Sequence, residues 1–125
     1  MLANARITAF LSTARPPESR AFYENVLGLR FVSDEQVALV FRLAHDVPLR
    51  IQKVEQVTPQ AFTAFGWQVD DILAVVRSLK ARGVTFERYD FIKQDAEGIW
   101  LAPSGTKVAW FKDPDGHLLS LSESP

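Results

Sequence analysis

Apolar residues along the chain recur at two spacings, one typical of strands and the other typical of helices. Both spacings appear, in the same order, in each half of the chain. In the first half, Phe22, Tyr23 and Val26 would form one buried face of a helix. The pattern there predicts a strand, a helix and three further strands, over Ile7–Ser12, Pro17–Val26, Leu29–Val32, Val37–Leu43 and Leu49–Val54.

The pattern restarts after one polar connector, Glu55–Pro59. Asp70 or Asp71 would cap the second helix, and Gly83 would end it. Asp113-Pro114-Asp115-Gly116 has the residues of a tight turn and predicts a closing hairpin. The expected elements are the strand Phe65–Val69, the helix Ile72–Arg82, and strands at Val84–Tyr89, Gly98–Ala102, Val108–Phe111 and Leu118–Leu121.

The two halves also match in sequence at one offset. Phe10 and Phe65, Gly28 and Gly83, and Phe31 and Phe86 are each 55 positions apart. Repeated units of this kind cannot bury their own apolar faces alone and need a partner unit. We therefore predict a single α+β domain over residues 1–125, built from paired βαβββ modules at about 5–55 and 62–123. One helix would cover one face of each sheet, and the other face would curve into a cup.

Composition narrows the class of protein. A chain of 125 residues with 47% hydrophobic and 23% charged residues is typical of one globular domain. A net charge of −1 argues against a general nucleic-acid or membrane-surface binder. The absence of cysteine excludes disulfides and thiolate metal sites. We see no signal peptide and no apolar run that could span a bilayer, so we expect a cytoplasmic protein.

Three stretches resemble the vicinal oxygen chelate superfamily, which includes glyoxalase I, the extradiol dioxygenases, and the fosfomycin and bleomycin resistance proteins. They are Ser19–Phe31, Val69–Phe86 and Trp110–His117. The resemblance implies a curved sheet with a cup-shaped cavity. It also implies a homodimer.

The resemblance further implies where metal ligands would lie in the metal-dependent members, which use His, Gln or Glu. The matching positions in this chain are Thr8, Ala64 and Ser120, with Gln52 nearest to a further ligand position. Neutral hydroxyls bind divalent ions too weakly to hold them alone. We therefore expect no metal and no other cofactor, which argues against the known metal-dependent activities.

Aromatic residues are the remaining candidates for a site, because ligand pockets are largely apolar with a few placed polar groups. The predicted pocket walls are Phe10, Phe41, Trp67 and Trp100, with Gln52 and Gln68 as polar anchors. A plain hydrophobic core is the alternative for the same aromatic residues. We expect His45 and His117 to lie in loops or turns, and the pairs Asp70/Asp71 and Asp113/Asp115 to cap a helix and build a turn.

Three functions remain open. The favoured hypothesis is a metal-independent protein that binds a small apolar or aromatic molecule, similar to the bleomycin resistance branch. The second is a metal-dependent lyase, isomerase or dioxygenase with atypical ligands. The third is a dimeric scaffold without a ligand. No catalytic residue can be assigned from the sequence, so enzymatic activity stays open.

Overall fold

The computed structural model describes residues 1–125, which form two compact units, Met1–Thr58 and Pro59–Pro125. None of the helices is both long enough and apolar enough to cross a membrane.

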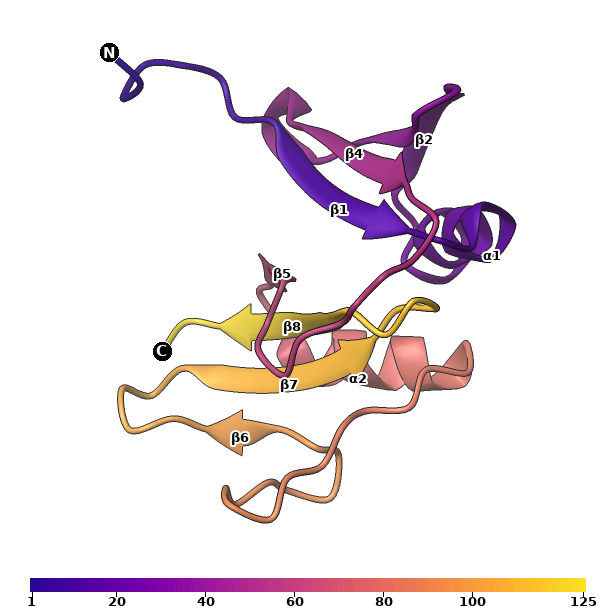
Figure 1. Cartoon of the computed structure of the whole chain (residues 1–125). Helices are drawn as coiled ribbons and strands as arrows, with labels where there is room; N and C mark the ends of the chain where they lie inside the picture. Colours follow the sequence, from indigo (N-terminus) through magenta and orange to yellow (C-terminus); the bar gives the residue numbers. More distant parts are fainter. The chain divides into compact units, whose positions relative to one another are not determined.

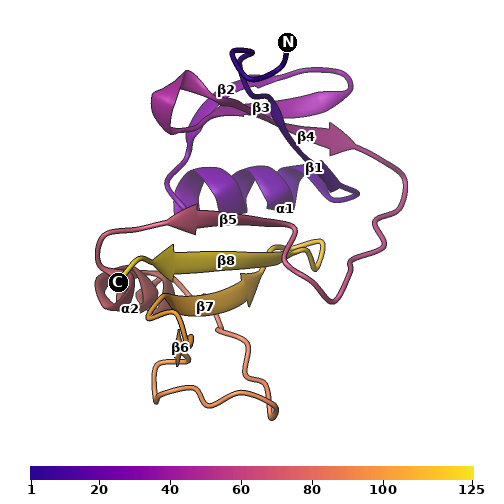
Figure 2. The ribbon, with the colours of Figure 1, turned by 90° about the vertical axis from the view of Figure 1, so that its left-hand side faces the viewer.

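The first unit holds one helix against a four-stranded sheet (Figures 1 and 2). The strand order is β1-β4-β3-β2, with β1 and β4 parallel and the other pairs antiparallel. The elements are β1 (Ala9–Thr13), α1 (Pro16–Ala21), a π-helical turn η1 (Phe22–Val26), β2 (Arg30–Asp34), β3 (Ala38–Arg42), a 3-10 turn η2 (Ala44–Asp46) and β4 (Pro48–Lys53).

The first helix is fixed by a proline at its start and by contacts of its last turns. Pro16 costs little there because the first helical N–H groups have no partner within the helix. Tyr23 is fully buried, and its ring lies 5.9 Å from that of Phe41. The guanidinium of Arg20 stacks 3.8 Å over the Phe31 ring. These contacts show that Phe31 and Phe41 face the helix.

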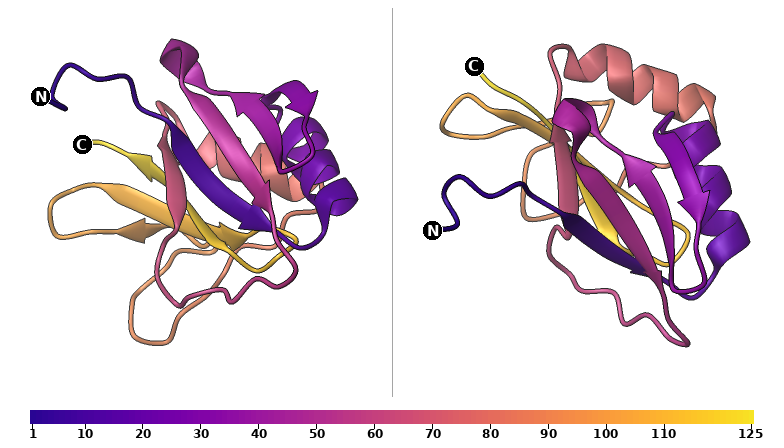
Figure 3. Two further views of the ribbon diagram at one scale, coloured as in Figure 1. Left: turned by 45° about the horizontal axis from the view of Figure 1, so that its top comes forward. Right: turned by 90° about the horizontal axis from the view of Figure 1, so that it is seen from above.

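The second unit repeats this topology (Figure 3). The strand order is β5-β8-β7-β6, again with the first pair parallel and the others antiparallel. Since both units have the same connectivity, the predicted α+β fold of paired βαβββ modules is confirmed. The elements are β5 (Phe65–Gln68), α2 (Ile72–Ala81), β6 (Trp100–Leu101), β7 (Lys107–Lys112) and β8 (Leu118–Glu123).

Helix α2 begins where the sequence predicts. The Asp71 carboxylate accepts a hydrogen bond from the Ala74 N–H at 3.1 Å, and Glu123 of β8 accepts one from the Ile72 N–H at 2.9 Å. Ile72, Val76 and Leu79 are buried. At the other end, Gly83 has a φ of 94°, a left-handed conformation that side-chain-bearing residues rarely adopt.

Two pairs of phenylalanines occupy the same place in the two units. Phe31 pairs with Phe41 across β2 and β3, with ring centroids 5.5 Å apart. Phe86 forms a single antiparallel bridge with Phe111 of β7, also with centroids 5.5 Å apart. The predicted equivalence of Phe31 and Phe86 therefore holds. The predicted equivalence of Phe10 and Phe65 is wrong by one residue. Leu49 pairs with Phe41 and Leu119 pairs with Phe111, so the two leucines are equivalent. Their partners on the other side are Ala9 and Phe65, so Ala9 and not Phe10 is the counterpart of Phe65.

The strand predicted at Val84–Tyr89 is wrong, because only Phe86 bridges to β7. The Glu87 N–H still donates to the Trp110 carbonyl at 2.8 Å, and the chain then leaves the sheet. It returns at Trp100, which pairs with Val108 as the edge strand β6. Phe86 and Phe111 are 25 positions apart (111 − 86), whereas Phe31 and Phe41 are 10 positions apart (41 − 31). The second unit therefore has 15 additional residues in this connection. The additional loop is called the 87–99 segment below, and it extends from the sheet beside β6 (Figure 2).

The closing hairpin turns as predicted. Asp113 is 6% exposed, and its carboxylate accepts hydrogen bonds from the N–H groups of Asp115 and His117 at 3.0 and 2.9 Å. Gly116 has a φ of 91°. This carboxylate is therefore occupied by the turn, which is the structural role that its sequence suggests.

Candidate functional site

Each sheet has one face toward its helix and one face away from it, and strand register assigns residues to them. Residues bridged across neighbouring strands share a face, whereas successive residues in one strand alternate. Trp67 pairs with Leu121 and so lies on the α2 side, where its ring packs 5.1 Å from that of Phe65. Gln68 pairs with Ser122, and Trp100 with Val108, on the face opposite α2. Of the three candidates in this unit, two therefore share a face.

The three candidates in the first unit are also divided between the helix-facing side of the sheet and the opposite face. Phe41 has no exposed surface and lies on the helix side, so the structure places it in the core rather than at a pocket wall. Phe10 pairs with Arg50, and Gln52 with Ala38, on the face away from α1. Phe10 is 53% exposed. Phe10 and Gln52 therefore remain available for contact, whereas Phe41 does not.

A cluster of aromatic rings lies on the face opposite α2. Trp110 is at its centre, with the Trp100 ring stacked at 6.0 Å and the Tyr89 ring edge-on at 5.7 Å. Phe91 packs against Tyr89 at 5.3 Å. The Trp110 indole N–H donates to the Thr63 hydroxyl at 3.1 Å, which fixes the indole plane. Such pairs contribute about 0.5–1.5 kcal/mol beyond their buried area.

The cluster walls a cavity of about 320 Å³, which is within the size range of small-molecule sites. Leu118, 6% exposed, lies at its base, whereas Phe62 and Phe91 are 67% and 83% exposed. We call it the aromatic pocket. Its lining residues are Ala61, Phe62, Thr63, Tyr89, Phe91, Ile92, Trp100, Trp110 and Leu118.

A more polar hollow of about 350 Å³ adjoins the aromatic pocket and shares Ala61, Tyr89 and Leu118 with it. Glu87 and Lys112 line it and form an ion pair at 3.4 Å. Burial, and secondly the negative charge of Glu87, raise the pKa of Tyr89 above its ordinary value of 10.0. The phenol therefore stays protonated at neutral pH and can donate a hydrogen bond at the junction of the two cavities.

One side chain holds the 87–99 segment in shape. The Gln94 amide accepts a hydrogen bond from the Tyr89 N–H at 2.8 Å and donates to the carbonyls of Glu87 and Gly98 at 3.0 and 2.8 Å. Asp95 accepts from the N–H groups of Glu97 and Ile99, each at 2.9 Å. These bonds take the place of pairing with β7, and together with the antiparallel bridge between Gln94 and Trp100 they position Tyr89 beside Trp110. The sequence analysis missed both Gln94 and Tyr89.

The positions matching metal ligands do not fit a divalent ion. Ala64 has no donor side chain, and Thr8 lies before β1 with an exposed side chain. Ser120 packs beside Gly66, so closely that a Cβ on Gly66 would overlap the Ser120 hydroxyl and lie 3.0 Å from its carbonyl oxygen. No group of three or more His, Cys, Asp or Glu side chains is placed to hold a metal ion. We derive no metal chemistry from these residues.

Comparison with known proteins was made by sequence and by structure. Residues 6–121 match the family model described as the Glyoxalase/Bleomycin resistance protein/Dioxygenase superfamily. No curated protein sequence matches the chain.

Several solved structures share the fold over nearly the whole chain. A superfamily member from Sphaerobacter thermophilus DSM 20745 superposes with a TM-score of 0.76 at 22% identity, covering 99% of this chain and 100% of that one. Lactoylglutathione lyase from Agrobacterium tumefaciens gives 0.75 at 16%, covering 98% and 96%. TnmS3, an antibiotic binding protein from Streptomyces sp. CB03234, gives 0.76 at 19%, covering 100% and 99%. At such identities the likeness shows the fold alone.

Proposed function

Because the chain belongs to the glyoxalase/bleomycin resistance protein/dioxygenase superfamily, we propose that it binds a small aromatic molecule without a metal ion. The observation that carries this proposal is the aromatic pocket, where Trp100, Trp110 and Tyr89 surround about 320 Å³ of space. The fold is shared by an enzyme and by a binding protein, the lactoylglutathione lyase and the antibiotic binding protein described above.

The chemistry of the pocket favours stacking over catalysis. Its walls are ring faces and edges, and its polar groups are the Thr63 hydroxyl and the Tyr89 phenol. Glu87, the carboxylate whose charge acts on the Tyr89 phenol, is paired with Lys112, and no carboxylate or histidine lines the pocket to make either group a nucleophile. A flat apolar ligand would gain burial against the indoles, and one hydrogen bond from Tyr89 would orient it.

The three tryptophans provide a direct test. In ¹⁵N-labelled protein each indole N–H gives its own signal, and neutral bicyclic aromatics such as 2-naphthol and quinoline are suitable probes. The expected result is that the Trp100 and Trp110 signals shift on titration, while the Trp67 signal, on the α2 side of the sheet, does not. Trp100→Leu should weaken binding, and Trp67→Leu should not. If no probe shifts Trp110 at millimolar concentration, the pocket does not bind aromatic molecules.

The absence of a metal requirement is tested separately. Equilibrium dialysis against Zn²⁺, Ni²⁺ and Mn²⁺ should leave no stoichiometric ion on the protein, and EDTA should not change probe affinity. One tightly bound ion per chain would instead favour a metal-dependent enzyme with atypical ligands.

We also propose a homodimer, supported by the exposed Phe10 on β1, an edge strand of its sheet. Edge strands with exposed apolar side chains tend to be covered. Sedimentation equilibrium should give twice the chain mass, and Phe10→Lys should weaken association. A monomer at high concentration would remove this part of the proposal.

A further inference from the structure

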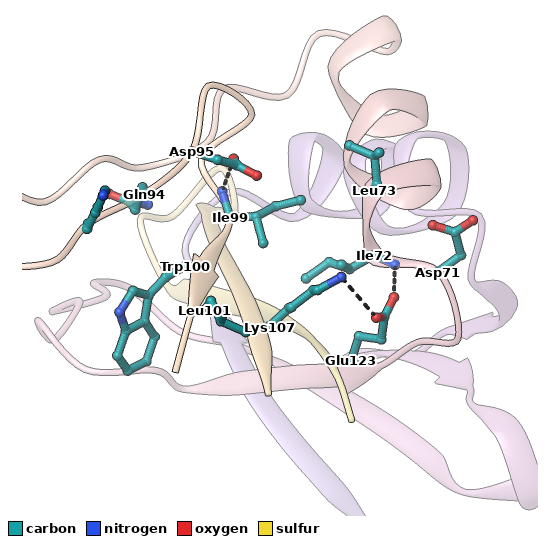
Figure 4. A pocket seen from close by; sticks show the side chains of 11 residues that line it. Asp71, Ile72, Leu73, Gln94, Asp95, Ile99, Trp100, Leu101, Lys107 and Glu123 are labelled. Atoms are coloured by element: carbon teal, nitrogen blue, oxygen red, sulfur yellow. Dashed lines mark hydrogen bonds and ion pairs between the residues drawn. The ribbon is translucent and has the colours of Figure 1, made fainter. Parts of the chain in front are cut away.

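A third cavity lies on the α2 side of the second unit (Figure 4). Its volume is about 730 Å³, also within the range of small-molecule sites. We call it the helix-side cleft. Its lining residues come from the start of α2, the 87–99 segment and the ends of three strands: Asp71, Ile72, Leu73, Lys93, Gln94, Asp95, Ile99, Trp100, Leu101, Lys107 and Glu123.

The floor of the helix-side cleft is aliphatic. Ile72 and Ile99 are 1% and 8% exposed, and Leu73 and Leu101 border them with 36% and 63% of their surface exposed. Figure 4 shows the side chains of Ile72, Leu73 and Ile99 directed toward one common space. An alkyl chain placed there would cover apolar surface that solvent now contacts, at about 25 cal/mol per Å².

The carboxylates of the helix-side cleft are already engaged by N–H groups of the chain. Asp71 accepts from Ala74, and Asp95 accepts from both Glu97 and Ile99. Glu123 accepts from the Ile72 N–H at 2.9 Å (Figure 4). Each of these bonds uses one carboxylate oxygen and ties the side chain to nearby backbone, so the three acidic side chains are held in place and are not free to turn toward a ligand.

The cations of the cleft, by contrast, have unused donors. Lys107 forms an ion pair with Glu123 (Figure 4), but its Nζ lies 3.7 Å from Glu123 Oε2, too far for a hydrogen bond, and it donates none elsewhere. Lys93 forms neither an ion pair nor a hydrogen bond. Each ammonium group can donate to an anion. We propose that the helix-side cleft is a second binding site, for an amphipathic molecule whose carboxylate binds Lys107 and Lys93 and whose alkyl chain lies on Ile72, Leu73 and Ile99.

This site differs in chemistry from the aromatic pocket, with which it shares one lining residue, Trp100, and it does not depend on the proposed function. Three probes of equal chain length separate the contribution of the head-group charge from that of the alkyl chain: octanoate, octylamine and 1-octanol. In protein with ¹³C-labelled Ile and Leu methyl groups, octanoate should shift the signals of Ile72, Leu73, Ile99 and Leu101. The Trp110 indole signal should stay in place. Octanoate should bind about tenfold more tightly than octanol, the ratio expected when one charge-assisted hydrogen bond is added.

Strand β7 supplies a matched pair of variants. Lys107→Met should weaken octanoate binding about tenfold and leave octanol unchanged, because only the charged anchor is lost. Lys112→Met, on the same strand but paired with Glu87 outside the cleft, should leave octanoate affinity unchanged. Lys93→Met breaks no bond in the folded chain, so it tests the second anchor without a risk to stability.

Results of two kinds would overturn the proposal. The first is octylamine binding as tightly as octanoate, or Lys107→Met and Lys93→Met both binding octanoate like the unmodified protein. The second is an octanoate response confined to Trp110, which would move the ligand to the aromatic pocket. Leu73→Trp provides a further check: Leu73 is exposed on α2, so the helix should persist by circular dichroism while the filled cleft loses octanoate.

Discussion

The Trp110 indole N–H donates a hydrogen bond to the Thr63 hydroxyl at 3.1 Å, although the two residues are 47 positions apart. Thr63 precedes β5, and Trp110 is central in β7, two strands away. This bond fixes the orientation of the ring against which both Tyr89 and Trp100 pack. The shape of the aromatic pocket therefore depends on a hydroxyl in the connector before β5.

Replacing that hydroxyl tests its role. Thr63→Val keeps the shape of the side chain and removes the acceptor, so the indole should become mobile and aromatic probes should bind several-fold more weakly. Thr63→Ser keeps the acceptor and should bind like the unmodified protein. Because Thr63 is exposed, we expect a loss of stability of at most about 1 kcal/mol in Thr63→Val. Equal probe affinity in both variants would show that the bond does not organise the pocket.

Gln94 should matter for the pocket although it lies behind it. Gln94→Ala removes three hydrogen bonds from a half-buried site, and we expect a loss of about 1–3 kcal/mol in the free energy of unfolding. Gln94→Glu has the same shape and keeps the acceptor for the Tyr89 N–H, but loses both donors. Amide hydrogen exchange should show faster opening of the 87–99 segment in both variants, with α2 unaffected. Unchanged protection of the Tyr89 N–H in Gln94→Ala would contradict this role.

The Tyr89 phenol should titrate above its ordinary pKa of 10.0, because burial and then the charge of Glu87 disfavour the phenolate. A pKa raised in the folded state stabilises the protein fully below the unfolded value. That contribution is lost as the pH rises from about 10 through the folded pKa. Tyrosine labelled with ¹³C at Cζ reports the midpoint directly by NMR.

Glu87→Gln should lower the Tyr89 midpoint, because it removes one of the two causes of the shift. Glu97→Gln is a suitable control, since Glu97 pairs with Lys80 instead. If Glu87→Gln leaves the midpoint where it was, burial alone accounts for the raised pKa.

The turn between β3 and β4 contains a local strain that can be relieved. His45 and Asp46 have φ values of 60° and 61°, a left-handed conformation that costs residues with a side chain about 1–2 kcal/mol each. His45→Gly should raise the free energy of unfolding by about 0.5–1 kcal/mol, after allowing for the greater freedom of glycine in the unfolded chain. Ala44 lies next to His45 and has a negative φ, so Ala44→Gly should lower the free energy of unfolding by a similar amount. Urea unfolding of both variants measures the difference.

Much of the fold could be predicted because it depends on local signals. Gly28 and Gly83 end the two helices, and Asp71 caps the second one. The strand predicted at Val84–Tyr89 failed for a non-local reason. Val84 to Glu87 alternate as a strand would, but beyond Phe86 the Glu87 carbonyl and the Tyr89 N–H bond to the Gln94 side chain instead of to β7. An amide five residues further along thus replaces a strand partner, and periodicity gives no sign of it.

The candidate site was only partly predictable. Trp67 and Gln68 are adjacent in β5 and must point to opposite faces, so both could not line one pocket. Phe41 lies in a strand that is apolar at four successive positions, Ala38 to Phe41, and such a run does not show which residues face the helix. Trp100 was found by its residue type. Its partners Tyr89, Thr63 and Trp110 come from three other segments, and only the folded chain brings them together.

The 87–99 segment supplies residues to the aromatic pocket and to the helix-side cleft. Tyr89, Phe91 and Ile92 line the aromatic pocket, and Lys93, Gln94, Asp95 and Ile99 line the helix-side cleft. The shorter connection between Phe31 and Phe41 in the first unit has no counterpart to it. Under the two proposals above, this one stretch of chain contributes to both ligand preferences, together with strand residues such as Trp110 and Lys107 of β7. Transplanting the stretch alone into another chain of this fold should therefore transfer neither preference, because the recipient's strands would also need Trp110 and Lys107.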